Sequence, residues 1–107
     1  MTTFKDIERG FEAKFAQDEN LKFRARARCN HLLGQWAAQK LGLTGPAVEA
    51  YAKGLVMVEF EKPGADSVFT QIRADFDAKG VALSDHQIRR TMDEYLTHAI
   101  SELKGAN

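Results

Sequence analysis

The chain has 107 residues, with 15 Lys or Arg balanced by 15 Asp or Glu, so its formal net charge is zero. This length suits one domain, and the balanced charge argues against a general nucleic-acid binder, which is usually basic overall. One cysteine, Cys29, excludes an internal disulfide and fits a reducing compartment.

Apolar residues recur with the period of a helix through most of the chain. Proline occurs only at Pro46 and Pro63, and no Asn-Gly hairpin signal interrupts the pattern. No apolar run approaches the ~18 residues of a membrane span, and the first residues lack the cationic start and apolar run of a secretion signal. We therefore predict an all-α, cytoplasmic protein with no direct membrane insertion.

The first segment, residues 1–18, carries an apolar stripe at helical spacing. As a helix, it would place the following residues within roughly 80° of one another: Phe4, Ile7, Phe11 and Phe15. An isolated helix of this length is marginal in water, and Gly10 costs it about 1 kcal/mol relative to Ala. We expect the segment to be mostly disordered alone and to become helical in a groove.

Two interpretations of residues 1–18 follow from helix lengths. A helix over residues 1–41 would be about 60 Å long, whereas the other predicted helices span roughly 22 to 33 Å. The segment is therefore either a short fifth bundle element, folded back at the polar residues 17–20, or an arm that inserts into another protein. We favour a mobile N-terminal arm (residues 1–18) followed by a bundle (residues 19–107).

The first long helix is predicted over residues 19–41, with Gly42 as its C-terminal stop. A second helix begins near Gly45, has Pro46 in its first turn and ends before Pro63. Its residues 55–60 include β-branched types that would suit a strand, but the helical period upstream favours helix.

Two further helices are indicated by their first residues. Asp66 is a good N-cap for the third, which Gly80 closes, and Ser84 with Gln87 forms the Ser-x-x-Gln capping box that begins the fourth. Four amphipathic helices with short connections predict a small four-helix bundle. Its predicted core consists of Leu21, Ala25, Cys29, Leu32, Leu33, Trp36, Val48, Tyr51, Ala52, Leu55, Phe60, Val68, Phe69, Ile72, Phe76, Ile88, Met92, Tyr95, Leu96, Ala99 and Leu103.

Residues with reactive side chains form no recognisable catalytic or metal-binding pattern. His31, His86 and His98 lack metal-ligand spacing, so a surface or helix-end position is expected for each. Cys29 is expected to act as a small hydrophobe at the core edge. No nucleophile with a base can be assembled, so we predict no enzymatic activity and no cofactor.

Three arginines, Arg24, Arg26 and Arg28, allow a nucleic-acid-binding alternative. Acidic Asp18 and Glu19 lie nearby, however, and arginine stems can cover an apolar stripe while their charges reach water. A basic rim around a protein-docking face is therefore favoured. A nucleotide-sensing bundle is a further alternative, although the sequence contains no phosphate-binding motif.

Four stretches carry a family resemblance: FEAKFAQDENLKF (residues 11–23), ARCNHLLGQWAAQKLG (27–42), AYAKGLVMVEFEKPGADSVF (50–69) and DHQIRRTMDEYL (85–96). They resemble the zeta subunit of the alphaproteobacterial F-type ATP synthase over nearly the whole chain. Phe-Glu-x-Lys-Phe-Ala combined with Asn-x-Leu-Leu-Gly-x-Trp-Ala-Ala makes the resemblance specific. The sequence departs from the family at Ile7 and Cys29, where arginine is common.

The resemblance implies a four-helix bundle with an inhibitory N-terminal arm. The arm would enter the interface between the catalytic β subunit, its α neighbour and the central γ shaft. There it would fold into a helix and block rotation in the hydrolysis direction, as a pawl does. The implied partners are thus the α, β and γ subunits of the catalytic head.

The partner-binding residues that this implies all lie in the arm. Phe4, Phe11 and Phe15 would be buried anchors worth about 2 to 3 kcal/mol each, and Ile7 extends their stripe. Charged residues are expected to pair at the groove rim and to set orientation. They are Asp6, Glu8, Arg9, Glu12 and Lys14.

Overall fold

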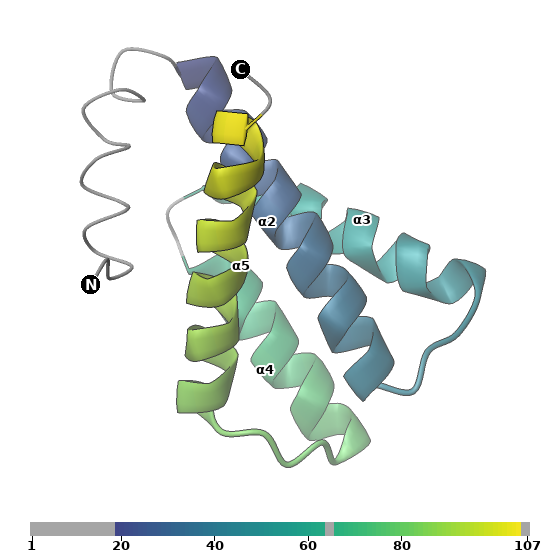
Figure 1. Ribbon diagram of the computed structural model, residues 1–107. Coiled ribbons are helices and arrows are strands. Elements are labelled where there is room, and N and C mark those ends of the chain that lie inside the picture. The colour runs from purple at the N-terminus through teal and green to yellow at the C-terminus, as the bar shows by residue number, and fades with distance from the viewer. Residues whose placement is uncertain (1–18, 64–65, 106–107) are drawn as a thin grey trace.

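The computed structural model describes residues 19–63 and 66–105, which form four helices and contain no strand. In the numbering of Figure 1, the helices are α2 (Glu19–Lys40), α3 (Pro46–Glu61), α4 (Ser67–Lys79) and α5 (Asp85–Gly105). The predicted all-α class and the four-helix architecture are confirmed, including helix rather than strand over residues 55–60. None of the described helices is long and apolar enough to cross a membrane.

Local signals explain most of the helix ends. Gly45 precedes α3 with a φ of 60°, which glycine adopts without strain, and Pro46 follows as the first helical residue. The capping box of α5 is present: the Ser84 amide donates to Gln87 Oε1 over 2.8 Å, and the Gln87 amide donates to Ser84 Oγ over 3.1 Å. Gly80 closes α4 with a φ of 71°.

Asp66 precedes α4 as predicted, but its side chain does not cap the helix. Its φ is 57°, and its carboxylate makes no hydrogen bond to the first turn. The carboxylate instead accepts two hydrogen bonds from the guanidinium of Arg89 on α5, one of them over 2.8 Å. The same guanidinium lies 3.8 Å from the ring centroid of Phe69. A charged partner on another helix has therefore displaced the local cap.

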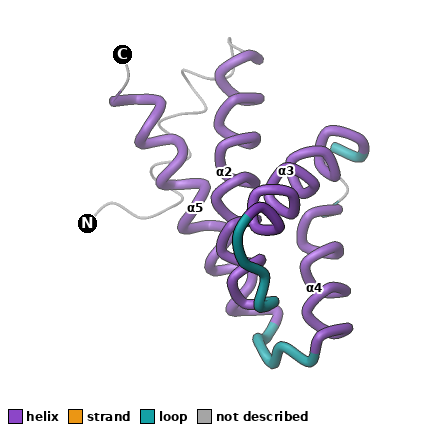
Figure 2. Tube along the Cα trace, turned by 90° about the vertical axis from the view of Figure 1, so that its right-hand side faces the viewer, coloured by secondary structure: helices purple, strands orange, loops and turns teal. Residues whose placement is uncertain are grey.

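Helix α2 is the central element of the bundle. It packs against α3 on one side and α5 on the other, and α4 closes the fourth position (Figure 1). Figure 2 shows the start of α2 and the end of α5 extending together past α4. The bundle therefore has four helices around its main core but fewer around the first turns of α2.

The main core lies where all four helices meet. Its largest fully buried side chains are Phe76, Leu33, Leu55, Ile72 and Ile88. Trp36 is only partly buried and meets the Phe76 ring edge-on, with centroids 5.7 Å apart. A smaller cluster joins the start of α2 to the end of α5 through Ala25 and Ile100.

One predicted core residue is on the surface. Phe60 keeps 61% of its area exposed, so its assignment to the core was wrong. At 100° per residue it lies about 140° around α3 from the buried Leu55, off the stripe that faces the main core. Its position near the end of α3 brings it instead beside the first turns of α2.

Candidate functional site

The predicted partner-binding residues of the arm lie outside the described residues. These are Phe4, Ile7, Glu8, Arg9, Phe11, Glu12, Lys14 and Phe15, together with Asp6. The structure does describe the surface that the arm joins, because α2 begins at Glu19, directly after it.

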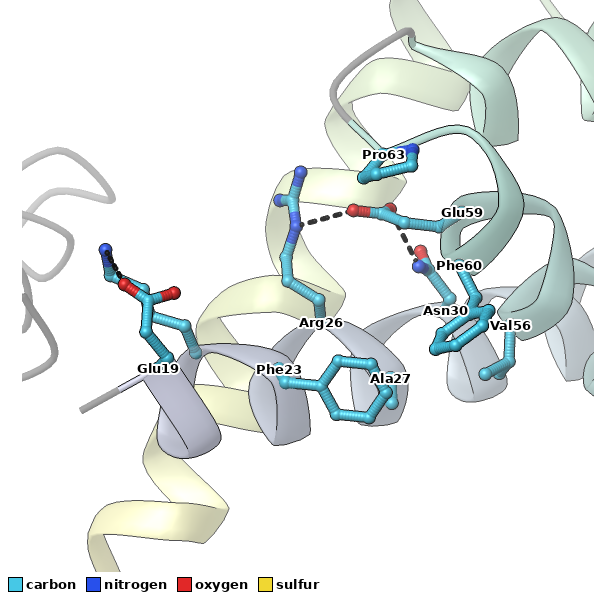
Figure 3. Close-up of a pocket in the computed structure, with 10 residues that line it drawn as sticks. Glu19, Phe23, Arg26, Ala27, Asn30, Val56, Glu59, Phe60 and Pro63 are labelled. Carbon is cyan, nitrogen blue, oxygen red and sulfur yellow. Dashed lines mark hydrogen bonds and ion pairs between the residues drawn. The ribbon is translucent and has the colours of Figure 1, made fainter.

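A groove opens at that junction, between the first turns of α2 and the last turn of α3 (Figure 3). We call it the α2–α3 groove; its volume is about 360 Å³. The residues that line it are Glu19, Lys22, Phe23, Arg26, Ala27, Asn30, Val56, Glu59, Phe60 and Pro63. This volume is in the range of pockets that bury ligands or side chains of a partner.

Two aromatic rings dominate the apolar wall of the groove. Phe23 of α2 and Phe60 of α3 meet edge-to-face, with ring centroids 6.1 Å apart and planes at 83°. Phe23 is 53% exposed and Phe60 61%, so each ring leaves more than half of its surface in water. Exposed aromatic residues that gather in a concave site are typical of an interaction surface.

The opposite wall of the groove is polar and internally paired. The buried Asn30 donates from Nδ2 to Glu59 Oε1 over 2.9 Å, and Arg26 donates from Nε to Glu59 Oε2 over 3.2 Å (Figure 3). Each oxygen of this carboxylate therefore accepts a hydrogen bond, and the network links α2 to α3 along this wall. The groove thus presents an apolar surface with a fixed polar edge, which suits the apolar face of an amphipathic helix.

Two of the three arginines, Arg26 and Arg28, form ion pairs within the bundle. Arg28 donates to both oxygens of Glu102, over 2.8 and 3.3 Å, and this hydrogen bonding lowers the pKa of Glu102. Arg26 pairs with Glu59, as described above. Only Arg24 of the three has no ion pair among the described residues. Paired guanidiniums disfavour a phosphate-binding patch, and Arg26 is one of the residues that line the α2–α3 groove.

His31 was expected at the surface or at a helix end, and this was wrong. It lies in the middle of α2, half-buried, with Nε2 2.8 Å from Glu49 Oε2 on α3. Its Nδ1 is buried and makes no hydrogen bond with the described residues. The hydrogen bond with His31 lowers the pKa of Glu49. This histidine therefore joins two helices, which its sequence position alone did not indicate.

The other reactive side chains agree better with the predictions. His86 and His98 are exposed on α5, where His98 Nε2 lies 3.2 Å from Glu102 Oε2. Cys29 is buried at the core edge, and burial raises its thiol pKa to about 12. Residues 19–63 and 66–105 contain no group of three His, Cys, Asp or Glu side chains that could hold a metal ion.

One of the comparisons with known proteins names a family for this chain. A family model described as "ATPase inhibitor subunit zeta" matches residues 1–102. A solved structure titled "Solution NMR structure of the protein" is similar with a TM-score of 0.70 at 30% sequence identity, covering 82% of this chain and 100% of that one. The comparison with curated proteins finds no match.

Proposed function

The chain belongs to the ATPase inhibitor subunit zeta family, and on this basis we propose that it inhibits ATP hydrolysis by the F-type ATP synthase through residues 1–18. Inhibitor subunits of this kind are regulatory. In this proposal the arm folds into a helix at the interface of the α, β and γ subunits of the catalytic head. The bundle of residues 19–107 stays outside the interface and carries the arm.

The observation that carries the proposal is the extent of the family match. It begins at residue 1 and continues to residue 102, so the arm and the bundle belong to one family pattern. The arm has the periodicity that a groove-bound helix needs, because its large apolar residues fall on one stripe. Among the described residues, the buried members of the main core all lie in α2 to α5.

The free-energy balance favours binding to a site on the catalytic head that is open only part of the time. Burying the three anchor phenylalanines contributes about 2 to 3 kcal/mol each. Ordering ~15 disordered residues costs on the order of 15 kcal/mol of backbone entropy. The remaining stabilisation must come from Ile7 and from charged residues of the arm that pair at the rim of this site on the head. Binding to a resting head would be weak, and a turning head that closes on the arm would hold it.

Hydrolysis and synthesis turn the shaft in opposite directions, so an arm trapped at one interface blocks one direction. We therefore expect the bound arm to stop hydrolysis, as a pawl stops a wheel in one direction, and to leave synthesis far less affected. No cofactor enters this mechanism. The site of action is the cytoplasmic side of the inner membrane, reached through the ATP synthase.

The test is ATP hydrolysis by a purified alphaproteobacterial ATP synthase head, with and without this protein. The full chain should lower the hydrolysis rate, and a variant that lacks residues 1–18 should not. Circular dichroism of the shortened variant checks that α2 to α5 still fold. Equal inhibition by both proteins would refute the arm mechanism.

The two alternatives stay predictions with their own tests. A nucleic-acid binder would remain on a nucleic-acid column at ~150 mM salt, although the ion pairs of Arg26 and Arg28 disfavour this. A nucleotide-sensing bundle would show shifted amide NMR signals when ATP or ADP is added.

A further inference from the structure

We propose that the α2–α3 groove is an intramolecular binding site for residues 1–18, occupied when the arm is not bound to its partner. The groove begins at Glu19, and the arm ends at residue 18, so the arm is tethered to the groove's edge. A tether this short gives an effective concentration in the millimolar range. The tether therefore favours this groove over a surface on a separate molecule.

The open side of α2 identifies where the arm can bind. On the side facing α5, the first turns of α2 are closed by the cluster around Ala25 and Ile100. On the side facing α3, Phe23 and Phe60 remain more than half exposed. Among the described residues near the start of α2, the large exposed apolar side chains that a returning helix stripe could cover lie on this second side.

The groove and the arm stripe have the same length. Along α2, the groove runs from Glu19 to Asn30. Along the arm, the stripe runs from Phe4 to Phe15. Each covers eleven residue steps, or about 16 Å in a helix. An arm helix that runs antiparallel to α2 would therefore cover the groove from end to end.

The connection between the two segments has the length of a helical hairpin. Three residues, numbers 16–18, separate Phe15 from Glu19, and antiparallel helices are commonly joined by two to five residues. Residues of the α2 wall, such as Phe23 and Ala27, follow the same spacing of three or four as the arm stripe. Antiparallel pairing then places Phe15 near the groove's start and Phe4 near its end.

Docking of the arm in the α2–α3 groove would regulate inhibition, an inference that rests on the proposed function. The stripe that would bind the catalytic head is the one that would bind the groove, so one arm cannot occupy both sites. The groove then competes with the head and reduces apparent affinity in proportion to the occupied fraction. A chain with a damaged groove should inhibit hydrolysis at lower concentration than the natural chain.

Paramagnetic relaxation in the full chain tests the docking directly. A nitroxide is attached at Ala13→Cys, on the arm face opposite the stripe, in a Cys29→Ala background. Amide signals of Ala27, Val56 and Phe60 should lose most of their intensity relative to the reduced nitroxide. Signals at the end of α4, such as Lys79, should keep theirs.

Matched variants separate the groove from the rest of α3. Phe60→Ser removes one of the two aromatic rings of the apolar wall, whereas Met57→Ser changes a residue of the same helix that is 50% exposed and does not line the groove. The broadening should disappear in the first variant and persist in the second. Phe11→Ser, in the arm, should also abolish it.

Three results would overturn the inference. The first is broadening confined to residues next to the tether. The second is equal broadening in the Phe60→Ser variant. The third is broadening caused by the nitroxide of another copy of the chain. The third is detected by mixing nitroxide-bearing unlabelled protein with ¹⁵N protein that has no nitroxide. Docking without inhibition of ATP hydrolysis would refute the proposed function alone, and inhibition without docking would refute only this inference.

Discussion

Gly34 of α2 lies directly against Ala52 of α3, so closely that a Cβ atom on Gly34 would come within 2.5 Å of the Ala52 Cα. Both residues are buried, and Ala52 is fully so. This contact sets how near α2 and α3 approach each other. The separation of the two helices in turn places Phe23 and Phe60 across the α2–α3 groove.

Gly34→Ala should destabilise the bundle by about 1 to 3 kcal/mol, because the added methyl forces two backbones apart. Gly54→Ala is the matched control. Gly54 is a helical glycine of α3 with no atom within 4 Å of an added Cβ, so this change should stabilise by about 0.5 to 1 kcal/mol. Urea unfolding followed by circular dichroism measures both; equal effects would contradict the close approach.

The phenylalanines of α3 and α4 should differ strongly in their contribution to stability. Phe76 is fully buried and packs on Trp36, so Phe76→Ala should cost about 3 to 5 kcal/mol. Phe60→Ala should cost about 1 kcal/mol or less, since it loses chiefly the ring contact with Phe23. Urea midpoints of the two variants test the contrast, and a large loss for Phe60→Ala would place that ring in the core after all.

The Asp66–Arg89 pair should make a small contribution to stability that depends on pH. Hydrogen bonds from Arg89 lower the pKa of Asp66 below its ordinary value of 3.8. Since the folded state binds this proton less readily than the unfolded state, the contribution is complete above about pH 4 and disappears as pH falls through the lowered pKa. Both side chains are about half exposed, which limits it to about 1 kcal/mol or less.

Asp66→Asn should therefore be less stable than the natural chain at pH 7 and equally stable near pH 2. Urea midpoints at the two pH values give the comparison. A stability difference that persists unchanged in acid would show that Asp66 acts through its backbone conformation rather than its charge.

Cys29 should be protected from alkylation while the bundle is folded. Cys29 is 5% exposed, and burial raises the pKa of its thiol to about 12, so very little of it is present as the reactive thiolate at pH 8. Iodoacetamide should label it rapidly in concentrated urea and very slowly in native buffer, as mass spectrometry would record. Comparable rates in the two conditions would mean that α2 separates readily from α5.

Phe15→Ala should weaken inhibition of ATP hydrolysis by about 10- to 100-fold, because losing a buried aromatic anchor removes about 1.5 to 3 kcal/mol. Ala13→Ser, on the opposite face of the arm stripe, should leave the half-inhibitory concentration unchanged. Titration of both variants against the purified head provides the measurement. Equal potency of the natural chain and Phe15→Ala would remove Phe15 from the binding residues.

The sequence by itself determined the four helices, their limits and the family. Helix boundaries follow from signals within a few residues of each other, such as the Ser84–Gln87 capping box and Gly80. The buried stripes followed from the helical period, which is why Leu33, Ile72 and Ile88 were correctly placed in the core.

Only the tertiary structure decided which surfaces meet. The exposure of Phe60, the pairing of His31 with Glu49 and the loss of the Asp66 cap to Arg89 each involve residues on different helices. Periodicity gives the direction of a side chain around its own helix, but not how far the neighbouring helix extends or which charge it carries. The α2–α3 groove depends on such contacts between helices. The first turns of α2 extend beyond the part of the bundle that four helices enclose, and the end of α3 lies beside them with the Phe60 ring exposed.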